Sequence, residues 1–411
     1  MNSYCKNVLY DIFGDNNADN PMKEFILLFN KYWNKNNNKL KKKFDNLTLS
    51  LNKIYDNKDD SLIKNSQRKI YKWENKINTE PYFYQEYNKK YNISYDKFYD
   101  LYNTRQTNNI EFNYVDYVKI KGKSNTIIDI INELQNSFFI GLDIKLYVDN
   151  YINNCIYYSF DHLDFYFFYN PDCIKSSEFD IILSEIYVIT KWIYQLNPIK
   201  IKLSYFDIPL NKRLNDSNNY ISFENVNSGL THINVEIILW RREEIFKVLI
   251  HELIHFLDID HKYEQNSINI QLGNIEYPIL INETFTELNA QFIHTIYVNY
   301  KYYKYDFDMF KKLYLSELIY SWYIFAKIIN FFNIDEFNIN NLIKKFNQSS
   351  NVFSYYVLKS LLCLEFLNGS NITDYDIDQI LKLYLPYFID KVIRKLKIND
   401  LSLRMCIFGK F

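Results

Sequence analysis

The chain has 411 residues, and its 48 lysines and arginines nearly balance 49 aspartates and glutamates, so the net charge is −1 and the pI is near 6.6. A near-neutral chain gives no bulk electrostatic reason to bind nucleic acid or an anionic membrane. Its five cysteines are scattered without a CxxC pair, which argues against a disulfide framework or a thiolate zinc site.

No stretch approaches the roughly 20 uncharged apolar residues that a membrane-spanning helix needs. The apolar run ILLFNKYW is too short and lies too far into the chain to be a signal peptide. The sequence therefore predicts a soluble intracellular protein in a reducing compartment. The 39 tyrosines and 32 phenylalanines come with abundant Asn, Ile and Lys, a bias that AT-rich codons produce, and only 7 glycines and 7 prolines interrupt the chain. Few breakers favour long helices.

Residues 1–115 are rich in Lys, Asn and Tyr. Weak helical periodicity appears in PMKEFILLFNKYW (21–33) and RKIYKWENKI (68–77), whereas NKNNNKLKKKFDN (34–46) is typical of a solvated or poorly ordered run. We interpret this part as an N-terminal helical region of unknown function.

From residue 116 strand and helix patterns alternate. Alternating or β-branched runs predict strands at 117–122, 164–171, 199–208 and 233–240, and apolar residues at helical spacing predict helices at 126–139, 176–198, 241–258 and 282–303. We place Glu243 and Glu244 in the first turn of helix 241–258, where the helix dipole favours acids. Beyond 305 the pattern is helical, for example at 315–332 and 377–396. The expected fold is α+β and helix-rich, with a core at 116–305 and a C-terminal helical subdomain at 306–411.

The segment VLIHELIHFLDIDH (248–261) holds three of the six histidines. His251 and His255 are four residues apart, so on a helix they share one face and can bind one ion. Glu252 projects beside them, where it can accept a proton from a metal-bound water. An apolar helix carries two imidazoles and a carboxylate at a high energetic cost unless they are paired or bound to metal. The pattern therefore predicts a zinc site with Glu252 as general base.

Two residues compete to be the third ligand. His261 has the spacing of the longer HExxHxxGxxH pattern, but that pattern needs glycine in a left-handed turn where this chain has Asp258. Glu283 begins a second predicted helix, and Glu287, four residues on, shares its face. Glu287 would then accept the outer N–H of a liganding histidine. His294 lies on the same stripe, too far along the helix to reach that ion, and we expect it to be a core or surface histidine.

The HELIH motif followed by NETFTE resembles the gluzincin branch of the zincin metallopeptidases, and the stretches 227–258 and 282–290 together resemble uncharacterised zincin-like proteins of large DNA viruses. The resemblance implies a zincin-like core, Zn²⁺ held by His251, His255 and Glu283, and a polypeptide substrate. If the source is viral, the expected location of the protein is the host cytoplasm or the virion. Tyr277, Tyr320 and Tyr323 are candidates for the donor that stabilises the reaction's oxyanion.

The strand at 233–240 is expected to be the sheet edge against which an extended peptide pairs. Two other hypotheses stay open: a zincin-like structural or virion protein that retains zinc without turnover, and a nucleic-acid-associated protein, against which the charge argues. The sequence leaves the oligomeric state open.

Overall fold

A computed structural model of the chain describes residues 21–56, 68–72, 125–214, 220–261, 279–368, 382–387, 389–390 and 402–408. The predicted strand at 117–122 and most of the predicted helix at 377–396 lie outside these residues. No helix in the described part is long and apolar enough to cross a membrane.

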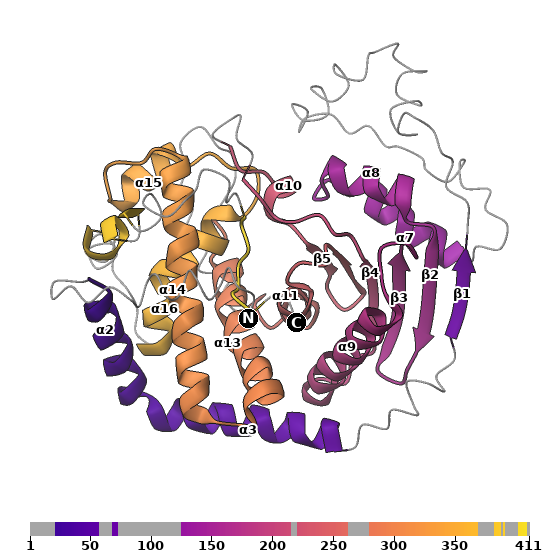
Figure 1. Ribbon diagram of the computed structural model, residues 1–411, viewed down its shortest axis with the longest axis horizontal. Helices are drawn as coiled ribbons and strands as arrows, with labels where there is room; N and C mark the ends of the chain where they lie inside the picture. The colour runs from indigo at the N-terminus through magenta and orange to yellow at the C-terminus, as the bar shows by residue number, and fades with distance from the viewer. Residues whose placement is uncertain are drawn as a thin grey trace, which may run out of the picture.

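One mixed sheet forms the frame of the described residues, in the order β1-β2-β3-β4-β6-β5 (Figure 1). The strands are β1 (Arg68–Lys72), β2 (Asn154–Ser159), β3 (Leu163–Tyr169), β4 (Ile201–Phe206), β5 (Gly229–His232) and β6 (Glu236–Trp240). β3, β4 and β6 run parallel, and the outer pairs β1–β2, β2–β3 and β5–β6 are antiparallel. The fold is therefore α+β and rich in helix, as the sequence predicted.

Alternation along the strands divides the core between the two faces of the sheet. In β6, Ile237 and Leu239 join the larger hydrophobic cluster, whereas Ile238 and Trp240 join the smaller one. Helices α9 (Ser176–Leu196) and α11 (Ile245–Phe256) supply the larger cluster, and α7 (Asn125–Asn136) and α8 (Leu142–Tyr151) supply the smaller. The sheet is thus covered by helices on both faces, which is why its central strands carry few polar side chains.

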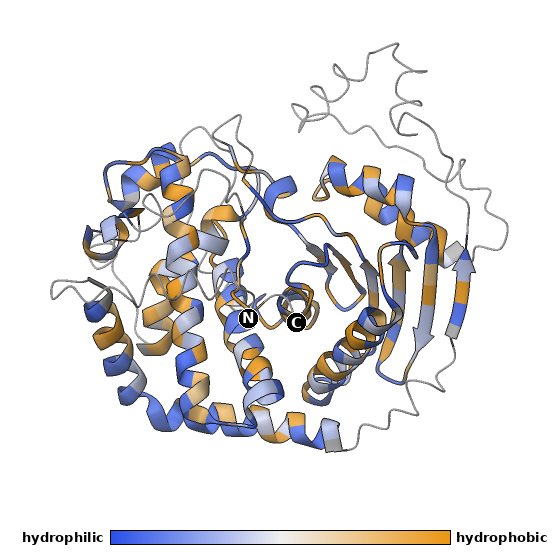
Figure 2. Cartoon of the chain, in the orientation of Figure 1, coloured by the Kyte–Doolittle hydropathy of each residue, from blue (hydrophilic) through white to orange (hydrophobic). Residues whose placement is uncertain are grey.

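A helical half lies beside the sheet and packs against α11 (Figure 1). It contains α13 (Ile281–Tyr303), α14 (Phe307–Phe331), α15 (Ile339–Lys345), the π-helix η2 (Phe353–Leu358) and α16 (Lys359–Asn368). Helix α2 (Pro21–Lys35) lies on its outside, and α3 (Asn37–Asp56) runs along the bottom of the view from this half to α9 (Figure 1). Hydrophobic and hydrophilic residues alternate along both helices (Figure 2). The short helix α10 (Phe223–Val226) precedes β5.

Three local predictions were wrong. The run 34–46 belongs largely to α3, because Leu40 and Phe44 bury one face of this otherwise polar helix. Residues 68–72 form strand β1 rather than a helix, since they pair with β2. Glu243 and Glu244 precede α11, because Arg241 and Glu244 have positive φ angles of 83° and 61°, which no helical turn accepts.

The predicted strand 233–240 is not the edge strand of the sheet. β6 lies between β4 and β5, and β5 is the edge strand on the side of α11. The cause is a tight connection through Asn234, whose φ of 57° turns the chain back so that β6 inserts beside β4. Residues 233–235 belong to that turn rather than to a strand.

Candidate metal centre

Helices α11 and α13 bring three metal-binding side chains to one point. His251 and His255 lie one turn apart on α11, and Glu283 lies in the first turn of α13. The apolar residues of α11, from Ile245 to Phe256, are buried and fix the rotation of the helix. That rotation turns both imidazoles toward α13, the helix with which α11 makes its most extensive packing contact.

The three donor atoms form a nearly regular triangle. Nε2 of His251 and Nε2 of His255 are 3.0 Å apart, and Oε2 of Glu283 lies 3.5 Å from the first and 3.2 Å from the second. Three corners of a tetrahedron drawn around Zn²⁺ at 2.0–2.1 Å would lie about 3.3–3.4 Å apart. Two nitrogens and a carboxylate oxygen are also donors that zinc prefers, so this set fits a tetrahedral zinc ion with one position left for water.

A further carboxylate supports each imidazole from behind. Nδ1 of His251 lies 2.9 Å from Oε1 of Glu287, and Nδ1 of His255 donates to Oδ2 of Asp260 at 2.7 Å. The remaining oxygen of Glu283 accepts from Asn351 Nδ2 at 3.3 Å. The hydrogen bond to Asp260 fixes the tautomer of His255 and leaves its Nε2 free to face the ion, and Glu287 lies close enough to Nδ1 of His251 to stabilise a proton there.

The turn after α11 separates Asp260 from His261. Asp258 takes the left-handed conformation, with a φ of 54°, that the longer histidine motif assigns to glycine. The turn nevertheless delivers Asp260, not His261, to the imidazoles. His261 is exposed and is not among the three donors that converge.

Glu252 is held against the edge strand. Thr231 Oγ1 of β5 donates to Oε2 of Glu252 at 2.7 Å. A Cβ atom added at Gly229 would lie 2.4 Å from Oε1 of Glu252, so only glycine permits this approach. His251, Glu252, Gly229 and Tyr355 line one cavity of about 40 Å³, a volume that suits a water molecule or a small group.

Electrostatics keep the Glu283 carboxylate ionised. Burial raises the pKa of Glu283, but the charges and hydrogen bonds of His255 and His251 outweigh burial and hold this pKa far below its usual value. Burial likewise opposes protonation of His255, yet Glu283 and Asp260 raise its pKa well above the ordinary value. A cation is therefore strongly favoured between these groups, whether it is a proton or a metal ion.

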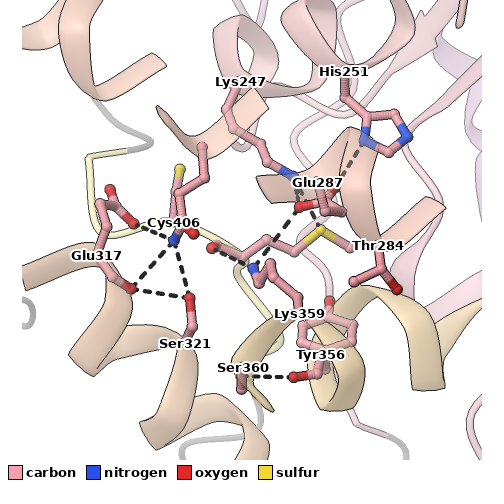
Figure 3. A network of polar contacts seen from close by, with 12 residues as sticks. Lys247, His251, Thr284, Glu287, Glu317, Ser321, Tyr356, Lys359, Ser360 and Cys406 are labelled. Atoms are coloured by element: carbon pink, nitrogen blue, oxygen red, sulfur yellow. Dashed lines mark hydrogen bonds and ion pairs between the residues drawn. The ribbon is translucent and has the colours of Figure 1, made fainter. Parts of the chain in front are cut away.

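Two buried lysines hold Glu287 in place. Lys247 Nζ on α11 contacts both carboxylate oxygens of Glu287, and Lys359 Nζ on α16 lies 3.8 Å from Oε2 (Figure 3). Lys247 Nζ also lies 3.4 Å from the sulfur of Met405. The residue that orients His251 is thus tied to the C-terminal part of the chain.

Two of the three predicted oxyanion donors lie away from the cavity beside Glu252. Tyr277 falls outside the described residues, and Tyr320 and Tyr323 are buried in α14, away from the cavity beside Glu252. Tyr355 lines that cavity instead, and its ring centroid lies 5.9 Å from that of His251. Burial, and next the negative charge of Glu283, raise the pKa of Tyr355 well above its usual value, so it remains a proton donor at neutral pH.

Sequence reasoning missed Tyr355, Asp260, Thr231 and Lys247. In a chain with 39 tyrosines one tyrosine carries no signal of its own. Tyr355 is distinguished only by its place in η2, because π-helical turns often occur at functional sites.

No model of a protein family, no curated protein and no solved structure matches this chain.

Proposed function

We propose that this protein is a zinc-dependent metallopeptidase with a zincin-like core and a polypeptide substrate. One observation carries the proposal: the donors of His251, His255 and Glu283 lie 3.0–3.5 Å from one another, with Glu252 beside them. Bound Zn²⁺ would lower the pKa of a water ligand toward 7 and polarise the peptide carbonyl.

The roles of the chain's own groups follow from their contacts. Glu252 is the general base: it takes a proton from the attacking water and passes it to the leaving amine. Its hydrogen bond from Thr231 occupies Oε2, which leaves Oε1 to receive that proton. The Tyr355 hydroxyl donates to the oxygen that becomes negative during attack.

The edge strand β5 gives the substrate a place to pair. In β5, Gly229 and Thr231 face Glu252, so an extended peptide added to this edge would run past the general base. The strand proposed to pair with the substrate is therefore residues 229–232 instead of the predicted residues 233–240.

The small size of the cavity favours a second hypothesis, in which zinc stabilises the fold or a partner-binding surface without turnover. Glu252→Gln separates the two. In the peptidase, this substitution keeps zinc and reduces hydrolysis of a quenched fluorescent peptide library by at least about 10²-fold, the size expected for loss of a general base.

A matched control is Glu236→Gln, which neutralises a carboxylate of β6 that pairs with Lys202 instead of facing the site. It should hydrolyse the library at the parent's rate. Equal rates for Glu252→Gln and the parent would remove the general-base role. Full zinc content with no hydrolysis by the parent would select the structural hypothesis.

A further inference from the structure

A second group of metal-binding side chains lies deeper in the molecule. His294 of α13, Glu317 of α14 and Cys406 of the C-terminal segment 402–408 place one donor atom each within 4.8 Å of the others. All three side chains are buried, with His294 and Glu317 at most 1% exposed. They come from three separate parts of the chain, and Figure 3 shows Cys406 next to Glu317.

Glu317 is a buried carboxylate with neutral partners. It accepts from the backbone N–H of Ile407 at 3.1 and 3.2 Å and from Gln291 Nε2 at 3.3 Å. Within the described residues, no lysine, arginine or histidine lies at ion-pair distance from it. Burial raises its pKa to about 7. The charge of Lys359 opposes this rise. A buried carboxylate without an ion-pair partner is costly, and proteins usually pair it with a cation or a metal ion.

Gln291 supplies an independent observation. Its Nε2 donates to Ser321 Oγ at 2.9 Å and to Glu317, which places the amide beside the cluster. Its Oε1 is fully buried and accepts no hydrogen bond from any described residue. Gln291 lies three residues before His294 on the same helix face. A half-turn of its amide group would exchange Nε2 and Oε1, and the oxygen would then face Glu317 as a fourth ligand.

We propose that His294, Glu317 and Cys406, with Gln291 as fourth donor, form a closed structural site for Zn²⁺. The mixture of imidazole, carboxylate and thiolate suits zinc better than the hard cations Mg²⁺ and Ca²⁺. Binding releases the thiol proton to solvent, and the thiolate and the carboxylate together neutralise the two charges of the ion. The bound ion would cross-link α13, α14 and the segment 402–408.

Zinc bound at this site would fix the position of the C-terminal segment 402–408. The backbone N–H of Cys406 donates to Glu244 Oε1 at 2.6 Å, so this segment already contacts the start of the metal-binding helix α11. A zinc ion would join it to α13 and α14 as well. Glu283 and His294 are eleven residues apart on α13 (294 − 283), roughly 16 Å along the axis, so the two ions would occupy separate sites.

The test uses the full chain and two readouts. Elemental analysis of the zinc-loaded protein should give about two equivalents in the parent and one each in Glu283→Gln and Cys406→Ser. Replacement of zinc by Co²⁺ adds a signature that needs no variant: a cobalt–thiolate bond gives a near-ultraviolet charge-transfer band that nitrogen and oxygen ligands do not give.

That band should appear in the parent and in Glu283→Gln and vanish in Cys406→Ser. Cys363→Ser is the matched control, because Cys363 is equally buried but belongs to α16 and donates to Ser360 O. It should keep the band. One equivalent of zinc and no thiolate band in the parent would overturn the second site alone. A parent without zinc would overturn both sites.

Discussion

Asp260 accepts a hydrogen bond from His255 across a turn that the chain makes in five residues. The Nδ1–Oδ2 distance is 2.7 Å, and Asn282 Nδ2 of the neighbouring helix lies 3.4 Å from the same carboxylate oxygen. Asp260 therefore connects the end of α11 with the start of α13. It holds the imidazole of His255 so that Nε2 faces His251 and Glu283.

Substitution of Asp260 by alanine should weaken zinc binding by about 10–100-fold, because the imidazole loses its orienting acceptor. Competition with a chromophoric chelator measures this affinity. Asp161→Asn, an exposed site in the β2–β3 turn, is the control and should bind zinc as the parent does. Unchanged affinity in Asp260→Ala would contradict the orienting role.

Removal of the Tyr355 hydroxyl tests the proposed oxyanion donor. Tyr355→Phe should lower kcat by about 10²–10³-fold while zinc content stays the same, since one donor acts mainly in the transition state. Tyr320→Phe, which removes the hydroxyl of a buried tyrosine in α14, should keep the parent's kcat. The assignment is wrong if the two variants have the same kcat.

The buried pair of Lys247 and Glu287 should show strong energetic coupling. Lys247→Met leaves Glu287 with His251, whose Nδ1 lies 2.9 Å away, and the more distant Lys359, and breaking a buried ion pair costs about 3–5 kcal/mol. The double variant Lys247→Met/Glu287→Gln buries no unpaired charge from this pair, so it should lose clearly less stability than the two single losses added together. Urea unfolding of the four proteins measures the coupling, and simple additivity would refute it.

The free energy of unfolding at acid pH should depend on His162, which lies far in sequence from both candidate metal sites. It is 1% exposed, its Nε2 lies 3.2 Å from Thr190 Oγ1, and burial lowers its pKa from 6.5 to about 3. Between these two values the unfolded imidazole binds a proton that the folded one does not. The free energy of unfolding therefore falls as the pH falls, by up to about 1.4 kcal/mol per pH unit from this group.

His162→Gln removes this contribution and should flatten the acid limb of the stability curve between pH 6.5 and 3 relative to the parent. Urea unfolding at several pH values gives both curves. Parallel curves would mean that the imidazole is protonated in the folded protein as well.

The sequence predicted those parts of the fold that local patterns determine. Helical spacing in α9 and α13 and β-branched or aromatic runs in β3 and β4 located these elements to within a few residues. The HExxH spacing likewise predicted which face His251 and His255 share, because four residues make about one helical turn.

Long-range features could not be found in this way. The insertion of β6 beside β4 depends on the turn at Asn234, and the pairing of β1 with β2 joins residues far apart in the chain. Asp260 and His261 are neighbours in sequence, and only the direction of the turn after Asp258 decides which one meets the imidazoles.

The third ligand provides the most direct test of the metal centre. Zinc content should be measured by elemental analysis in Glu283→Gln and in His261→Asn. Both variants carry Cys406→Ser as a common background, so that only zinc bound at the centre on α11 is counted. We expect about one equivalent of zinc in the background protein and in His261→Asn, and almost none in Glu283→Gln. Full zinc in Glu283→Gln, with loss in His261→Asn, would contradict it.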